Sequence, residues 1–189
     1  MVKSAKKISK FLFHERTLGN VIRFSAKRRL KDETVAEHSF HVALYSMILA
    51  DLEEKFGNRV DKEKLIKSAL LHDLEECMTG DIIFDFKHSN EKLAKEIKKM
   101  GLQFYKGLMA NLPDNLSQEY INLWENGKNP TTIEGQILNA ADKLEALMYS
   151  IEEYKLGNKN FEEVIDGLKK VLNGMKLKSL DIFMKELNL

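Results

Sequence analysis

Hydrophobic residues recur along this chain at spacings of three and four positions, and no segment alternates convincingly with a period of two. Spacing of that kind places apolar side chains on one face of an α-helix, so the pattern predicts an all-α fold. Only two prolines occur, Pro113 and Pro130, and both fall between helical segments. Because no repeat, low-complexity stretch or long linker divides the chain, we expect one domain of about six to eight helices.

The helical pattern covers most of the chain. We expect helices over Ala5–Glu15, from Thr34 to near Gly57, from Asp61 to before Gly80, over Asn90–Asn111, over Leu116–Asn126, from Thr131 to near Gly157, over Phe161–Leu172 and over Lys178–Leu187. Two of the starts have the spacing of a capping box, in which a threonine caps the helix and a glutamate three residues later reaches back. They are Thr34 with Glu37 and Thr131 with Glu134. The stretch from Gly80 to Ser89 is the most loop-like central segment.

Composition narrows the class of protein. The chain has 189 residues, 43% of them hydrophobic and 31% charged, with a formal net charge of +1. Such a balance is typical of a globular domain and argues against a partner that is a nucleic acid polymer, which usually calls for a strong basic excess. No run approaches the roughly 20 apolar residues of a membrane span, so we expect no membrane association. The single cysteine, Cys77, favours a reducing, cytoplasmic setting.

One dipeptide stands out against this background. His72 and Asp73 lie side by side in an apolar stretch that is expected to be a buried helix. Buried groups of this kind are costly unless they are paired or bound to a metal. Adjacent side chains on a helix point about 100° apart, so both reach one ion only if it lies over the edge that they share.

Two further residues have the chemistry to complete a metal site with His72 and Asp73: His38 and Asp142. Two imidazoles and two carboxylates suit Mn, Fe, Co, Ni or Zn better than Ca²⁺, which prefers oxygen ligands. Four ligands leave positions open for water, whose pKa a bound metal lowers. Glu76 lies four residues after His72 on the same helix face, which suits a general acid or base.

Each residue also has a structural interpretation. A His-Asp pair arises by chance in many helices. His38 taken alone is typical of a helix start, and Asp142 could simply pair with Lys143 or Lys92.

The motifs taken together resemble the HD-domain metal-dependent phosphohydrolases, over roughly residues 8–155. The matching segments are Ala36-Glu37-His38-Ser39, Leu71-His72-Asp73-Leu74-Glu75-Glu76, Thr79-Gly80-Asp81 and Ala141-Asp142-Lys143-Leu144. Within that superfamily the chain looks similar to the 5'-deoxynucleotidases, which remove phosphate from deoxyribonucleoside 5'-monophosphates. The resemblance implies a single HD-type helical bundle over residues 1–189, with its core at about 8–155 and closing helices at 158–189, and a homodimer.

The resemblance also implies roles for individual residues. The implied metal ligands are His38, His72, Asp73 and Asp142. Glu76 matches the acid/base glutamate of this branch, and Asp81 matches an aspartate beside the nucleotide. Arg23 matches an arginine that holds the phosphate, a task that suits the planar guanidinium because it donates paired hydrogen bonds. Phe24 stands where this branch usually has a tryptophan against the sugar, so selection against ribonucleotides is expected to be weaker.

The sequence therefore predicts a phosphohydrolase that acts on (deoxy)nucleoside 5'-monophosphates with one divalent transition metal, Mn, Co, Ni, Fe or Zn, with Mg²⁺ less well suited. The first alternative is another HD-type reaction, on nucleotide phosphodiesters or triphosphates. The second is a non-catalytic helical binding protein that contains the metal for structure alone, against which the open metal positions and Glu76 argue.

Overall fold

The computed structural model describes residues 2–87 and 89–187, and the regular elements of that part of the chain are helices, joined by one isolated bridge between Ile22 and Thr34. The helices of nine residues or more are α1 (Val2–Glu15), α2 (Val35–Lys55), α3 (Lys62–Leu71), α6 (Glu91–Met109), α7 (Asp114–Asn126), α8 (Ile133–Lys155), α9 (Glu162–Asn173) and α10 (Lys178–Glu186). The shorter ones are η1 (Arg16–Asn20), α4 (Glu76–Thr79), α5 (Phe84–Lys87) and η2 (Lys159–Phe161). The prediction of a single all-α domain is confirmed.

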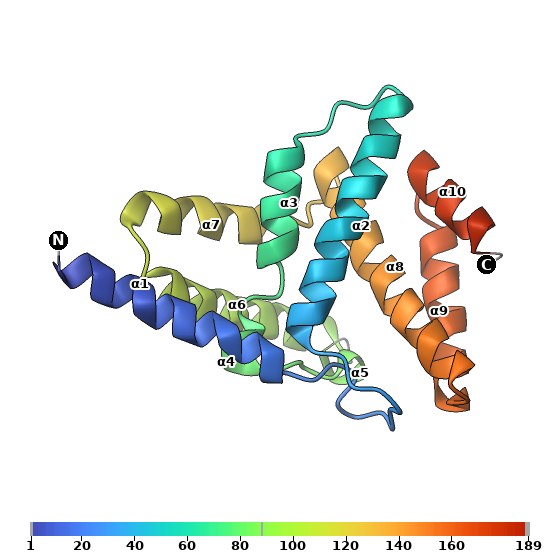
Figure 1. Cartoon of the computed structure of the whole chain (residues 1–189), viewed down its shortest axis with the longest axis horizontal. Helices are drawn as coiled ribbons and strands as arrows, with labels where there is room; N and C mark the ends of the chain where they lie inside the picture. The colour runs from blue at the N-terminus through green and yellow to red at the C-terminus, as the bar shows by residue number, and fades with distance from the viewer. Residues whose placement is uncertain (1, 88, 188–189) are drawn as a thin grey trace.

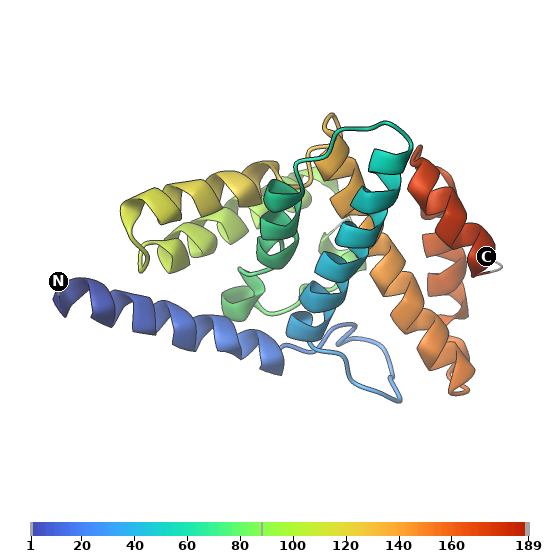
Figure 2. The ribbon, with the colours of Figure 1, turned by 45° about the horizontal axis from the view of Figure 1, so that its top comes forward.

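Helices α2 and α8 pack against each other at the centre of the molecule (Figure 1). Helix α3 lies against one side of this pair, and α9 and α10 cover the other. Helices α6 and α7 form a hairpin beyond α3, and α1 runs beneath it toward the far edge of the molecule (Figure 2). The two ends of the chain therefore lie on opposite sides.

The core consists of two hydrophobic clusters. The larger one joins α2, α3, α8, α9 and α10 around fully buried residues such as Leu49, Leu65 and Leu147. Burial of one such side chain contributes about 1.5–3 kcal/mol. The smaller cluster lies between η1, α3, α6 and α7 and includes Tyr105 and Leu123. The start of α2, the end of α3 and the middle of α8 meet where the clusters adjoin, and this junction holds the polar residues discussed below.

The first predicted capping box is confirmed. The Thr34 hydroxyl accepts a 3.2 Å hydrogen bond from the backbone N–H of Glu37, and the Glu37 carboxylate accepts a 2.8 Å bond from the N–H of Thr34. These bonds satisfy donors that a helix start leaves without partners. The start of α2 is thereby defined, and His38 is placed in the first turn.

The expected helix through His72 and Asp73 is wrong in its length, because α3 ends at Leu71. Ring nitrogen Nδ1 of His72 lies 2.7 Å from the carbonyl oxygen of Ala69 and competes for a group that the helix would use. The chain continues in a turn and re-enters a helix only at Glu76, the start of α4. Because His72 and Asp73 lie in this turn, their side chains are not held about 100° apart as neighbours on an α-helix are.

Two smaller expectations also need correction. Thr132, not Thr131, caps α8, with its hydroxyl accepting a 3.1 Å bond from the N–H of Gly135. Glu134 is consequently one position short of a capping box, and its carboxylate instead accepts the N–H of Asp61 at 2.9 Å. The expected loop from Gly80 to Ser89 contains the short helix α5.

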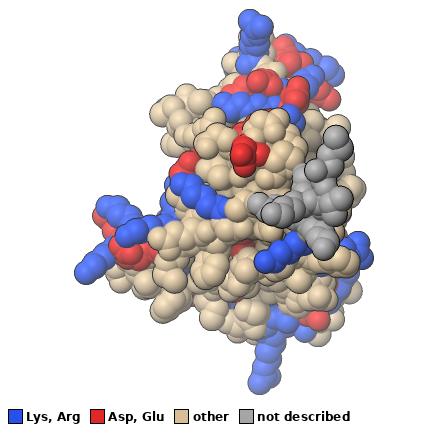
Figure 3. All heavy atoms as spheres, turned by 90° about the vertical axis from the view of Figure 1, so that its left-hand side faces the viewer, with Lys and Arg blue, Asp and Glu red and all other residues tan. Residues whose placement is uncertain are grey.

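On the face that lies at the left of Figure 1, most of the visible surface is uncharged, and Lys and Arg lie beside Asp and Glu along its upper and left-hand parts (Figure 3). None of the helices in the described part of the chain combines the length and the apolar character that crossing a membrane requires.

Candidate active site

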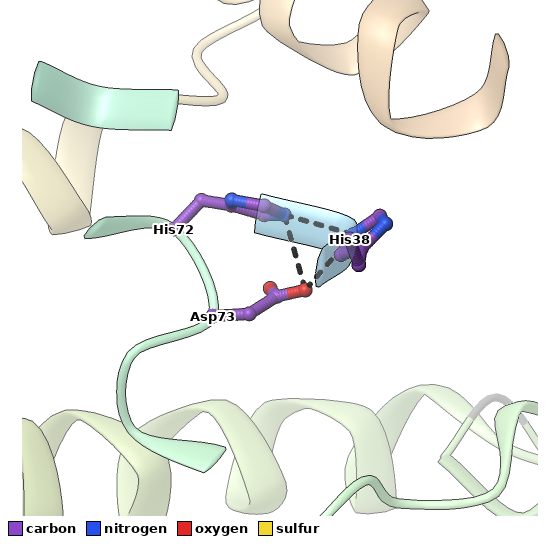
Figure 4. A group of neighbouring side chains, drawn as sticks. All are labelled: His38, His72 and Asp73. Carbon is purple, nitrogen blue, oxygen red and sulfur yellow. Dashed lines mark hydrogen bonds and ion pairs between the residues drawn. The ribbon is translucent and has the colours of Figure 1, made fainter. Parts of the chain in front are cut away.

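Three segments bring His38, His72, Asp73 and Asp142 together. His38 comes from the first turn of α2, His72 and Asp73 from the turn after α3, and Asp142 from the middle of α8. The Nε2 atoms of the two histidines are 3.3 Å apart, and Oδ2 of Asp73 lies 3.0 Å from Nε2 of His72 and 3.5 Å from Nε2 of His38 (Figure 4). Oδ1 of Asp142 completes the group at 3.4 Å from Nε2 of His38.

The outward nitrogens of both histidines are occupied by acceptors. Nδ1 of His72 faces the Ala69 carbonyl, and Nδ1 of His38 forms a very short contact with the Glu145 carboxylate. Each Nδ1 therefore carries the hydrogen, and in a neutral ring Nε2 then presents a lone pair. The ring nitrogens of His38 and His72 and the Asp73 carboxylate lie within 4.8 Å of one another, a donor group that could hold a divalent cation, and Asp142 reaches this group through its contact with His38.

The pKa values of His38 and Asp142 also indicate that the site favours a positive charge. Burial and Arg23 would lower the pKa of His38, but hydrogen bonds with Asp142, Asp73 and Glu145 raise it to about 10. Burial would likewise raise the pKa of Asp142, yet Lys128 and Lys143 hold it well below its usual range. The site thus favours a cation, either a proton or a metal ion, beside ionised aspartates.

Lys128 and Lys143 are the lysines that contact Asp142. Their Nζ atoms lie 2.8 Å and 3.1 Å from Oδ2 of Asp142. Lys128 also approaches Oδ1 of Asp73 at 3.9 Å, and it comes from the turn that precedes α8. The expected alternative of an Asp142–Lys143 pair is therefore present together with the histidine cluster. The second lysine at Asp142 is Lys128 rather than the expected Lys92.

Arg23 lies on the outer side of His38. Its Nη1 atom donates to Oε2 of Glu145 at 2.8 Å and also forms a very short contact with Glu33. The guanidinium is mostly buried, with 12% of the side chain exposed. Burial and the neighbouring Glu145 raise the pKa of Glu33, whereas His38 and Arg23 lower that of Glu145 against the effect of its own burial. Glu145 is consequently the ionised member of the pair.

Phe24 and Asp81 are joined by their own contact. The backbone N–H of Phe24 donates to Oδ2 of Asp81 at 3.0 Å, and the Phe24 carbonyl accepts from Arg29 at 2.8 Å. Phe24 has a φ of 51°, a left-handed conformation that is rare for an aromatic residue. Its ring stacks on Tyr149 with centroids 5.4 Å apart and meets the edge of Phe161. These contacts hold a strained residue next to Arg23, and such strain is frequent at functional sites.

A cavity of about 860 Å³ extends from His72 and Asp73 into the space between α4, α6 and α7. Glu76 and Lys87 line it, as do apolar side chains that include Phe104 and Trp124. Burial, followed by Asp73 and Asp81, raises the pKa of Glu76 to about 9. Arg23, Phe24 and Asp81 are not among the described residues that line this cavity, although Asp81 is close enough to raise the pKa of Glu76.

Sequence reasoning did not find Glu33, Lys128 or Glu145. A signal existed for Glu145, which follows Asp142 by three positions and so shares its helix face. Glu33 and Lys128 lie outside the long helices, where hydrophobic periodicity carries no positional information.

Comparisons with known proteins identify the family of this chain. The sequence profile of the family described as YfbR-like 5'-deoxynucleotidase matches residues 10–188. A 5'-deoxynucleotidase of Photorhabdus laumondii is 33% identical over 179 residues, which cover 94% of this chain and 90% of that protein. Another, from Vibrio vulnificus, is 29% identical, with 93% of this chain and 91% of that protein covered.

Among solved structures, an HD-domain phosphohydrolase from Listeria innocua superimposes with a TM-score of 0.85 at 28% identity, covering 95% of this chain and 86% of that one. The PH0347 protein of Pyrococcus horikoshii has a TM-score of 0.75 at 26% identity, with 95% of each chain covered. The chain therefore belongs to the YfbR-like 5'-deoxynucleotidase family and is a hydrolase with the fold of HD-domain phosphohydrolases.

Proposed function

We propose that this protein is a metal-dependent phosphohydrolase that releases phosphate from (deoxy)nucleoside 5'-monophosphates. The observation that carries the proposal is the closeness of two imidazole Nε2 atoms and the Asp73 carboxylate, with Asp142 beside His38, next to a cavity that His72, Asp73 and Glu76 line. Family membership supports the substrate class, because the curated relatives are named 5'-deoxynucleotidases.

In this proposal His38, His72, Asp73 and Asp142 hold one divalent ion. When bound, such an ion lowers the pKa of coordinated water and offsets negative charge on a phosphoryl group. The mixed nitrogen and oxygen donor set suits Mn²⁺, Co²⁺, Ni²⁺, Fe²⁺ or Zn²⁺. Mg²⁺ fits less well because it usually binds oxygen ligands and keeps several of its waters.

Glu76 is the proposed general acid/base. Its carboxyl group lines the same cavity as His72 and Asp73 and stands at the start of α4, one short turn beyond them. With its pKa raised to about 9, this carboxyl group is protonated at neutral pH, so it can donate a proton to the departing 5'-oxygen of the nucleoside.

Arg23 is the proposed phosphate ligand, with Phe24 and Asp81 beside it. Glu33 and Glu145 fix the guanidinium through Nη1, so the plane of its remaining donors is set before a substrate arrives. Asp81 fixes the backbone of Phe24, and the stacked Tyr149 fixes its ring. We propose that Phe24 meets the sugar, with weaker exclusion of ribonucleotides than a tryptophan would provide.

We further propose a cytoplasmic homodimer. One side of α2 exposes four large apolar residues at helical spacing, which supports a partner surface there: Phe40, Leu44, Met47 and Ile48. The only cysteine is free, as expected of a protein in a reducing compartment.

A metal and substrate screen tests the proposal. Protein stripped with a chelator is reloaded separately with Mn²⁺, Co²⁺, Ni²⁺, Zn²⁺ and Mg²⁺, and released phosphate is measured for 2'-deoxy and ribo 5'-monophosphates. We expect phosphate from the monophosphates with at least one transition metal, and a larger deoxy preference in Phe24→Trp than in the wild type. Cyclic nucleotides and triphosphates complete the panel. Hydrolysis of these alone, or of nothing, would contradict the proposed substrate class.

A further inference from the structure

A single oxygen atom joins the two halves of the site. Oε2 of Glu145 contacts Nδ1 of His38 and also accepts the hydrogen bond from Nη1 of Arg23. Glu145 is buried, with 2% of its surface exposed, and lies on α8 three residues after Asp142. The same stretch of helix therefore provides both an expected metal ligand and the contact between His38 and Arg23.

This contact determines how the His38 ring can act. A carboxylate accepts hydrogen bonds and donates none, so Nδ1 of His38 must carry the hydrogen and Nε2 is left facing Asp73 and Asp142. Carboxylates that orient a metal-binding histidine in this way raise the basicity of its other nitrogen. On its opposite side, the same oxygen holds the guanidinium of Arg23 at 2.8 Å.

We propose that Glu145 is a positioning residue that aligns His38 for the metal and Arg23 for the phosphate at the same time. The inference rests on the proposed function for the roles of those two residues. Glu145 touches neither the metal nor the substrate in this assignment, and it acts through His38 and Arg23.

Glu33 offers a comparison within the same cluster. It contacts Nη1 of Arg23 and the Glu145 carboxylate, but within the described part of the chain it forms no hydrogen bond or ion pair with His38. If Glu145 served only to hold Arg23, replacement of either glutamate should affect phosphate binding alone. If Glu145 aligns both partners, only its replacement should weaken metal binding.

Calorimetric titrations of three glutamate-to-glutamine variants separate these possibilities. Glu145→Gln, Glu33→Gln and, as a matched control on α8, the exposed Glu152→Gln are titrated as metal-free proteins with Mn²⁺ or Co²⁺. The metal-loaded proteins are then titrated with inorganic phosphate. Neither titration depends on turnover, so a failure of the proposed reaction and a failure of this inference are distinguishable.

We expect Glu145→Gln to weaken metal affinity by about 10- to 100-fold, as outer-shell substitutions do, and to weaken phosphate affinity as well. Glu33→Gln should weaken phosphate binding alone, and Glu152→Gln should change neither. Unchanged metal affinity in folded Glu145→Gln, or an equal loss in Glu33→Gln, would overturn the inference. If Glu145→Gln does not fold, Glu145→Asp repeats the titrations with the charge kept and the reach shortened, and wild-type metal affinity in that variant would also overturn it.

Discussion

The indole N–H of Trp124 donates a 2.7 Å hydrogen bond to Oε2 of Glu75, which links α7 to the turn that carries Asp73. Burial and the neighbouring Asp73 raise the pKa of Glu75 to about 7. The Trp124 ring also stacks on Tyr105 of α6, with centroids 5.3 Å apart. The cavity wall and the candidate metal site are thus parts of one packed unit.

Replacing Trp124 with phenylalanine should destabilise the protein. The substitution keeps an aromatic ring against Tyr105 but removes the donor to Glu75, which leaves a buried carboxyl group without this partner. Loss of such a bond costs about 1–3 kcal/mol. Urea unfolding followed by circular dichroism measures the change. In the Glu75→Ala background, which has no acceptor for the indole N–H, the same substitution should cost less, and an equal cost in both backgrounds would show that the hydrogen bond contributes nothing.

Asp73→Asn should abolish metal retention and hydrolysis together. The change keeps the side-chain volume but removes a negative charge that faces both histidine Nε2 atoms. Because changes outside the ligand shell already cost about 10- to 100-fold in affinity or activity, loss of a ligand should exceed that range. Metal analysis after gel filtration and a phosphate-release assay check the two effects. Asp166→Asn, an exposed change on α9, is the control. Wild-type activity in Asp73→Asn without bound metal would contradict the assignment.

Metal should also stabilise the fold. A ligand that binds only the folded chain adds about 2.7 kcal/mol when its concentration is 100 times its Kd. We therefore expect thermal unfolding to shift upward on addition of Mn²⁺ or Co²⁺, and the shift to reverse on addition of a chelator. Asp73→Asn should show little or no shift. An equal upward shift in wild type and Asp73→Asn would place the metal elsewhere.

Much of the fold follows from local sequence rules. The start of α2 is set by the short-range chemistry of Thr34 and Glu37, and the eight long helices follow the apolar periodicity of segments that bury one face. The end of α3 was missed because it depends on the His72 side chain, which bonds the backbone in place of the helix. Whether the His72 ring or the helical backbone bonds the Ala69 carbonyl depends on the position of His72 in the fold, which hydrophobic periodicity does not indicate.

The site residues that could be predicted are polar residues that interrupt an apolar stretch of sequence. A histidine and an aspartate in an apolar run are conspicuous, whereas Glu145 in the amphipathic α8 resembles any solvent-facing glutamate. Its burial is visible only once Arg23 and His38, from distant parts of the chain, are seen to surround it. Pairings between distant segments of this kind are beyond sequence periodicity.

Stability in acid should depend on Glu153. Burial would raise the pKa of this carboxyl group, but hydrogen bonds from Asn158 and from the N–H groups of Leu30 and Lys31 lower it below its ordinary value. The stabilisation is therefore complete above the unfolded-state pKa of about 4.3 and is lost as the pH falls through the lower folded-state pKa.

Glu153→Gln tests this dependence. We expect the variant to lose on the order of 1–3 kcal/mol at neutral pH, since the bonded acceptor is no longer charged, and to show a flatter decline of stability between about pH 5 and 3. Urea midpoints across that range measure both effects. The neighbouring Glu152→Gln, on the exposed side of α8, should follow the wild type. A wild-type pH dependence in Glu153→Gln would contradict the prediction.

Two glycines should respond to alanine with opposite signs. A Cβ atom at Gly135 would lie 1.9 Å from the carbonyl oxygen of Asn129, in the turn that follows Lys128, whereas a Cβ at Gly167 on α9 meets nothing within 4 Å. Gly135→Ala must displace backbone next to the candidate site, and we expect a loss of more than about 4 kcal/mol, a size that points to a specific steric conflict. Gly167→Ala should gain about 0.5–1 kcal/mol, because alanine is the better helix former. Urea unfolding measures both.

Because Asn139 donates 3.0 Å and 2.8 Å hydrogen bonds to the carbonyls of Lys128 and Gly135, the displacement should also weaken metal binding in Gly135→Ala and leave it unchanged in Gly167→Ala. Equal stability of the two variants would show that the close approach of α8 to this turn is not a constraint on the fold.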